Sequence, residues 1–98
     1  MIELEITILQ ARMEHSKADG YVGNVEFQVE HHKAPYEITL YSRDNKEWMY
    51  GLHFLHESGN EQEIFLVEDF LDENDESFDR LVQAAKEAFL QDSSQTNV

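Results

Sequence analysis

The fold of this chain is decided by residues 25–40, which read VEFQVEHHKAPYEITL. Apolar and polar residues alternate on both sides of the central segment 32–35. An alternation of period two is typical of a strand that buries one face and exposes the other. The stretch therefore predicts two strands joined by a loop at 32–35, each with one face against a core.

The flanking sequence extends this pattern in both directions. Residues 2–8 alternate in the same way and predict an N-terminal strand, and the apolar runs at 48–55 and 63–67 predict a fourth and a fifth strand. Residues 10–23 have no sustained period and contain the turn dipeptide Asp19-Gly20, so we interpret them as a connection, with room for the first strand to run on into it. The middle of the chain is thus predicted to be an antiparallel meander.

The pattern changes after Asp69, where apolar residues recur at spacings of three and four. These residues are Phe78, Leu81, Val82, Ala85, Ala88 and Phe89. Acidic residues precede them, where the helix dipole favours negative charge. We predict an α+β fold: an antiparallel sheet of about five strands with one C-terminal helix packed on one face. The single domain would span residues 1–91, and residues 92–98, which lack apolar anchors, would form a disordered tail.

The predicted fourth and fifth strands are apolar on both faces, and one helix can cover only one of them. The second face would be covered by residues 10–23, by curling of the sheet, or by another molecule. The last alternative leads to the hypothesis of a homodimer, or of a docked partner, on that face.

Charge is the most uneven property of the sequence. The chain has 21 acidic and 7 basic residues, a formal net charge of −14 and no cysteine. Eleven of the acids lie between Glu47 and Asp79, a segment without Lys or Arg. Such a charge disfavours nucleic acid and anionic lipid, which are bound through Lys and Arg. The absence of cysteine excludes disulfides, thiolate nucleophiles and Cys-ligated zinc.

The start of the sequence carries Glu3 and Glu5, whereas a signal peptide begins with basic residues. No apolar run approaches the length of about 18 residues that a membrane helix needs. We therefore expect a cytoplasmic protein without membrane association.

Motifs for metal binding and catalysis are weak. His31 and His32 are neighbours in an extended segment and would point to opposite faces. A calcium loop starting at Asp72 has Ser77 where glycine is required and Gln83 where a bidentate Glu is required. No nucleophile elbow or phosphate-binding glycine loop is present. We predict no metal, no cofactor and no catalytic residue, and therefore a non-enzymatic protein.

Two interpretations of the acidic segment remain. It could serve only solubility, or it could bind a protein partner with a basic surface, in a binding or regulatory role. The candidate partner-binding residues are Glu68, Asp69, Asp72, Glu73, Asp75, Glu76 and Asp79, with an exposed Trp48 or Tyr50 as apolar anchor. The alternative is a small-molecule or divalent-metal-binding domain that uses the apolar second face of the sheet.

Overall fold

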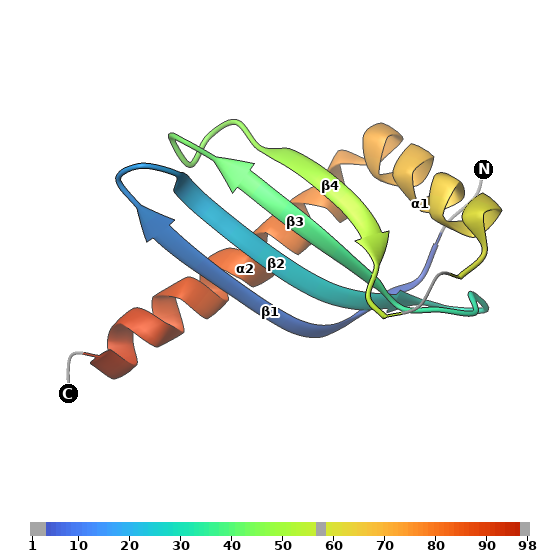
Figure 1. Cartoon of the computed structure of the whole chain (residues 1–98), viewed down its shortest axis with the longest axis horizontal. Coiled ribbons are helices and arrows are strands. Elements are labelled where there is room, and N and C mark those ends of the chain that lie inside the picture. Colours follow the sequence, from blue (N-terminus) through green and yellow to red (C-terminus); the bar gives the residue numbers. More distant parts are fainter. Residues whose placement is uncertain (1–3, 57–58, 97–98) are drawn as a thin grey trace.

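The computed structural model of the chain describes residues 4–56 and 59–96, with side chains up to residue 90. Four antiparallel strands in the order β1-β2-β3-β4 form one sheet, and two helices cover one of its faces (Figure 1). The elements are β1 (Ile6–Ser16), β2 (Gly20–Val29), β3 (Tyr36–Ser42), β4 (Met49–Phe54), α1 (Glu61–Glu73) and α2 (Asp75–Thr96). The predicted α+β class with an antiparallel sheet is confirmed, and the described residues form four strands instead of five and two helices instead of one.

The two strands predicted from residues 25–40 are the centre of the sheet. The apolar residue of each alternating pair is buried against the helices, as Phe27 and Tyr36 are, both with no exposed surface. The register places Phe27 opposite Tyr36 and Val25 opposite Ile38, so the apolar positions of β2 and β3 share one face. Their alternation is the direct cause of the one-sided core.

The prediction that residues 10–23 form a connection is wrong for most of the segment, whereas the alternative that the first strand runs on into it is confirmed, with the turn at residues 17–19. β1 runs on to Ser16 and β2 begins at Gly20, so most of the segment is a long hairpin. A β-bulge between Ile8 and Gln10 shifts the alternation by one residue. Even-numbered positions face the core before the bulge and odd-numbered positions after it, so that Met13 is buried. Strict alternation of period two therefore predicts only the part of β1 that precedes the bulge.

The predicted fifth strand at 63–67 is also wrong, because these residues belong to α1. The side chain of Asn60 accepts hydrogen bonds from the backbone N–H groups of Gln62 (2.8 Å) and Glu63 (3.2 Å) and caps the helix. The residues of α1 that are buried have helical spacing: Ile64, Val67 and Leu71. The intervening Phe65 and Leu66 are apolar but exposed, which gave the run its appearance of a strand buried on both faces.

The C-terminal helix predicted from residues 78–89 is confirmed as part of α2. Its residues Leu81, Val82 and Ala85 are buried, and it packs mainly on β1 and β2 with further contacts to α1, whereas α1 contacts β4 (Figure 1). α2 continues to Thr96, within the segment predicted as a disordered tail. The last two residues of that tail lie outside the described residues.

We expect Asn60→Ala to lower the free energy of unfolding by about 1 kcal/mol, since two backbone N–H groups of α1 lose their acceptor. Urea unfolding followed by circular dichroism measures the difference. Asn60→Ser, which keeps an acceptor oxygen, is the control and should lie close to the wild type. An Ala variant with an unchanged midpoint would mean that this cap does not stabilise α1.

Candidate functional site

The seven predicted acidic residues all lie in the helical layer, around the junction of α1 and α2. Four are in the second half of α1 and three in the beginning of α2: Glu68, Asp69, Asp72, Glu73, Asp75, Glu76 and Asp79. All are exposed except Glu68, which is half-buried. Asn74 ends α1 and accepts a hydrogen bond from the N–H of Ser77, so it holds the two helices at this corner.

Within residues 4–56 and 59–90, no Lys or Arg forms an ion pair with any of these seven acids. The ion pairs of the sheet use other acids: Arg12 lies 3.4 Å from Glu26 and 3.3 Å from Glu37. α1 itself contains no basic residue. Among the described side chains, the seven acids at the helix junction therefore have no ion-pair partner, and the basic residue nearest to them in sequence is Arg80, which follows Asp79.

Tyr50 was predicted as an exposed anchor, but it points from β4 toward the helices. Its hydroxyl donates a hydrogen bond to Asp72 Oδ1 at 2.7 Å and lies 3.4 Å from the carbonyl oxygen of Glu68. Its ring centroid is 5.4 Å from that of Phe78. Burial raises the pKa of the Tyr50 hydroxyl above its ordinary value, and the Asp72 carboxylate raises it further. Tyr50 thus joins β4 to α1 instead of presenting an apolar surface.

Trp48, the other predicted anchor, is half-buried and lies immediately before β4. It packs against the core, with its ring centroid 6.4 Å from that of Tyr21. The Nζ atom of Lys86 lies 5.8 Å from the centre of the indole ring, within reach of a cation–π interaction. The side chain of Trp48 therefore packs mainly against other residues of this chain.

The apolar side chains that do accompany the acidic residues are Phe65 and Leu66. Their exposed fractions are 58% and 46%, and both lie in the middle of α1. Sequence reasoning missed them because it placed them in a strand. The spacing of Ile64, Val67 and Leu71 by three and four residues is typical of the buried face of a helix. It would have predicted that Phe65 and Leu66, which lie off that face, are exposed.

The second face of the sheet is mostly polar rather than apolar. Arg12 bridges Glu26 and Glu37, and His53 Nε2 lies 2.8 Å from Glu37 Oε1. Asn24 donates a hydrogen bond to Thr39 on the same face. One guanidinium, that of Arg12, thus lies near two carboxylates, so the negative charge of this face is partly compensated by an ion pair, unlike that of the acids at the helix junction.

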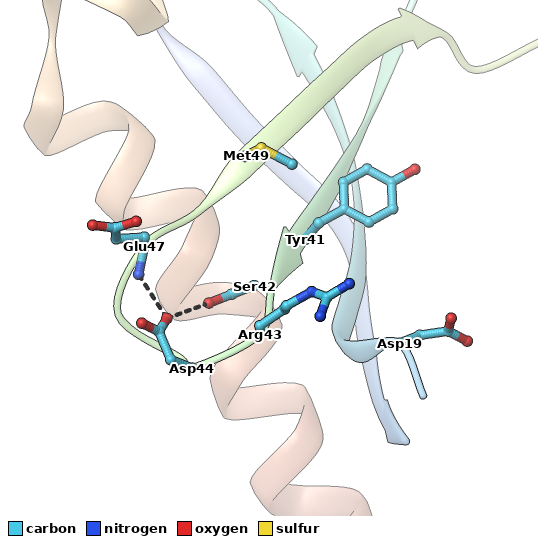
Figure 2. A pocket seen from close by; sticks show the side chains of 7 residues that line it. All are labelled: Asp19, Tyr41, Ser42, Arg43, Asp44, Glu47 and Met49. Carbon is cyan, nitrogen blue, oxygen red and sulfur yellow. Dashed lines mark hydrogen bonds between the residues drawn. The ribbon is translucent and has the colours of Figure 1, made fainter. Parts of the chain in front are cut away.

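A hollow of about 620 Å³ lies at the end of the sheet where the β3–β4 loop turns (Figure 2). Tyr41 and Met49 contribute exposed apolar surface, and the guanidinium of Arg43 lies between Tyr41 and Asp19. Asp44 accepts hydrogen bonds from Ser42 Oγ and from two backbone N–H groups, at 2.9 and 3.1 Å. The hydrogen bonds from those N–H groups, led by that of residue 47, lower the pKa of the Asp44 carboxyl.

Among the described residues, no group of three His, Asp or Glu side chains is placed to hold a metal ion. None of the helices in the described part of the chain combines the length and the apolar composition needed to cross a bilayer. Comparison with protein-family models, with curated proteins and with solved structures found no match to this chain.

Proposed function

We propose that this chain is a cytoplasmic, non-enzymatic binding or regulatory module whose helical layer engages a basic surface on a protein partner. The surface concerned is formed by α1 and the beginning of α2, residues 61–79, and is called the acidic surface below. The observation that carries the proposal is the exposure of Phe65 and Leu66 on a helix that has no basic residue and whose acids have no counter-ion among the described side chains.

The two features serve different steps of binding. Uncompensated carboxylates create a negative potential that attracts a basic partner over roughly a Debye length, about 8 Å at physiological salt. Exposed apolar side chains contribute once water is excluded, and residues of this kind at the centre of an interface provide much of its binding energy. A surface that served only solubility would gain nothing from Phe65 and Leu66, since exposed apolar side chains favour association.

The charge also selects the class of partner. Phosphate groups of nucleic acids or anionic lipids would be repelled, so we propose a protein with clustered Lys or Arg. A second copy of the chain would bring its own acidic residues to this surface and would be repelled in the same way. We therefore propose a basic protein, and not a second copy of the chain, as the occupant of the acidic surface.

The alternative, a small-molecule or divalent-metal site on the second face, would have to use the hollow at the β3–β4 loop. Asp44 there already accepts hydrogen bonds from one hydroxyl and two backbone N–H groups. Tyr41 and Met49 form an apolar wall beside it. Of the described carboxylates that also line the hollow, those of Asp19 and Glu47 point away from that of Asp44 (Figure 2). We therefore prefer the protein partner.

The test compares two variants with the same change in net charge. Asp69→Asn, Glu73→Gln and Asp79→Asn together remove three exposed acids of the acidic surface but keep Asp72, which accepts the hydrogen bond from Tyr50. We expect the wild type to capture a basic protein at about 50 mM salt and to lose it at about 300 mM. The triple variant should bind that protein at least about tenfold more weakly at low salt.

The matched control removes three exposed acids elsewhere: Glu14→Gln, Asp19→Asn and Glu30→Gln. It should retain the affinity of the wild type, because these positions lie at the β1–β2 hairpin and at the end of β2. Circular dichroism of both variants verifies that each is folded. If both variants lose the partner equally, only net charge matters, and if neither does, the acidity serves solubility alone.

A further inference from the structure

β4 is an edge strand, and the hydrogen bonding of β3 shows which of its backbone groups are unpaired. The N–H of Leu55 donates to the carbonyl of Pro35 at 3.1 Å, and these two residues lie one step beyond the opposite pair Tyr36 and Phe54. Hydrogen-bonded pairs alternate along an antiparallel ladder, so Gly51 and His53 are the next residues of β4 that pair with β3. The N–H and C=O groups of Tyr50, Leu52 and Phe54 must then point away from the sheet.

No described residue forms a backbone or side-chain hydrogen bond with those groups of Tyr50, Leu52 and Phe54. They form a regular row, because alternate residues of a strand direct their backbone groups to the same side. Such a row is a template for one further strand.

The other edge of the sheet is protected, in contrast to β4. β1 is interrupted by the bulge between Ile8 and Gln10 and carries the charged side chains of Arg12 and Glu14. Bulges and charges are the usual means by which proteins prevent pairing at a sheet edge. β4 reads MYGLHF, with no bulge, no proline, no Lys and no Arg. A Cβ atom added at Gly51 would meet no atom within 4 Å, so the strand is also uncrowded on the second face.

The electrostatic surroundings of β4 decide what can pair with it. α1 lies beside the strand, and its Asp72 accepts a hydrogen bond from Tyr50. The Glu68 and Asp69 carboxylates are close enough to act on the Tyr50 hydroxyl as well. A second copy of the chain paired along β4 would bring another acidic α1 to this region. A strand with Lys or Arg at alternate positions would instead place its positive charges beside these carboxylates.

We propose that β4 binds an extended basic segment of the partner as a fifth strand, with the backbone of that segment paired to Tyr50, Leu52 and Phe54. The choice of a basic segment rests on the proposed function, whereas the pairing itself rests on the unpaired edge. Side chains of the added strand alternate between the helical side and the second face. Every second residue, on the helical side, would be Lys or Arg near Asp72 and Asp69.

The probe is a synthetic peptide of about seven residues in which lysine alternates with valine, long enough to span a typical strand. Two further peptides of the same sequence carry N-methyl groups on alternate backbone amides, one on the odd and one on the even positions. All three have the same charge and the same side chains. Strand addition predicts that one methylated peptide binds at least about tenfold more weakly than the parent, while the other retains its affinity.

Hydrogen exchange measured by NMR locates the pairing on the wild-type protein. With the unmethylated peptide bound, the amide protons of Tyr50, Leu52 and Phe54 should exchange more slowly, whereas those of Gly51 and His53, already paired with β3, should change little. Equal affinity of the two methylated peptides, or no binding of the parent peptide, would overturn the proposal. Protection that depends on protein concentration without any peptide would also overturn it, by making a second copy the occupant.

The proposed function can fail separately. If the Asp69, Glu73 and Asp79 variant loses the peptide while hydrogen exchange at β4 is unaffected in the wild-type complex, the acidic surface binds a basic segment but strand addition is wrong. If the protected amides and the methylation pattern are as predicted but the variant binds as tightly as the wild type, strand addition holds and the acidic surface does not select the partner.

Discussion

Leu81→Ala is expected to lower the free energy of unfolding by about 3 kcal/mol. Leu81 has no exposed surface and belongs to the face of α2 that packs on the sheet. Removing its side chain takes away the transfer free energy of the lost carbon atoms and leaves a cavity, and such changes cost about 2 to 5 kcal/mol in well-packed cores. For a domain of this size that is a large part of the total stability. Urea unfolding at equilibrium measures it.

The control for Leu81 lies on the same helix. Gln83 is exposed, so Gln83→Ala keeps the helix propensity high without changing the core and should stay within about 0.5 kcal/mol of the wild type. The slope of the unfolding transition should be the same in both variants if the protein unfolds in one step. A loss below about 1 kcal/mol for Leu81→Ala would mean that α2 is not held on the sheet as the structure has it.

The elements that were predictable are those whose pattern has a single period. β2, β3 and the part of α2 around Leu81 each bury one face, so apolar positions recur at intervals of two or of three and four. β1 was only partly predictable, because its bulge changes the phase of the alternation after Ile8. α1 was mistaken for a strand because Phe65 and Leu66 fill the intervals between its buried residues. Both errors arise where tertiary packing allows a local departure from regular patterning.

The candidate site was predictable in composition, and in position only for the acids at the start of α2, not for those of α1. Charge counting along the sequence found the acidic residues, because charge needs no knowledge of the fold. Their separation from the sheet follows from α1 being a helix, which the sequence analysis did not recognise. Because of the same error, the wrong apolar residues were predicted to be exposed. Phe65 and Leu66 are exposed, whereas Trp48 and Tyr50 pack toward the helices. The unpaired edge of β4 was not predicted, because residues 63–67 were expected to pair with it as a fifth strand.

Gly20→Val is expected to lower the free energy of unfolding by at least about 3 kcal/mol. Gly20 begins β2 directly after the hairpin loop at residues 17–19, and its φ angle is +75°. That conformation is common for glycine after a three-residue hairpin loop but costs other residues about 1 to 2 kcal/mol, and more for a β-branched one. A Cβ atom here would also lie 2.6 Å from the carbonyl oxygen of Ser42 and 2.9 Å from the Cα atom of Arg43. Both are backbone atoms, so neither can move aside without displacing β3.

Gly51→Val is the matched control, since it makes the same chemical change in the same sheet. A Cβ atom at Gly51 meets nothing within 4 Å, and its φ angle is not positive. Valine also suits a strand better than glycine does, so this variant should be at least as stable as the wild type. The difference between the two variants in urea unfolding isolates the backbone conformation at Gly20 from the general cost of a glycine-to-valine change. Equal stability of the two would show that the β1–β2 hairpin does not turn at Gly20 with a left-handed residue, and the long β1 strand that the hairpin creates would have to be reconsidered with it.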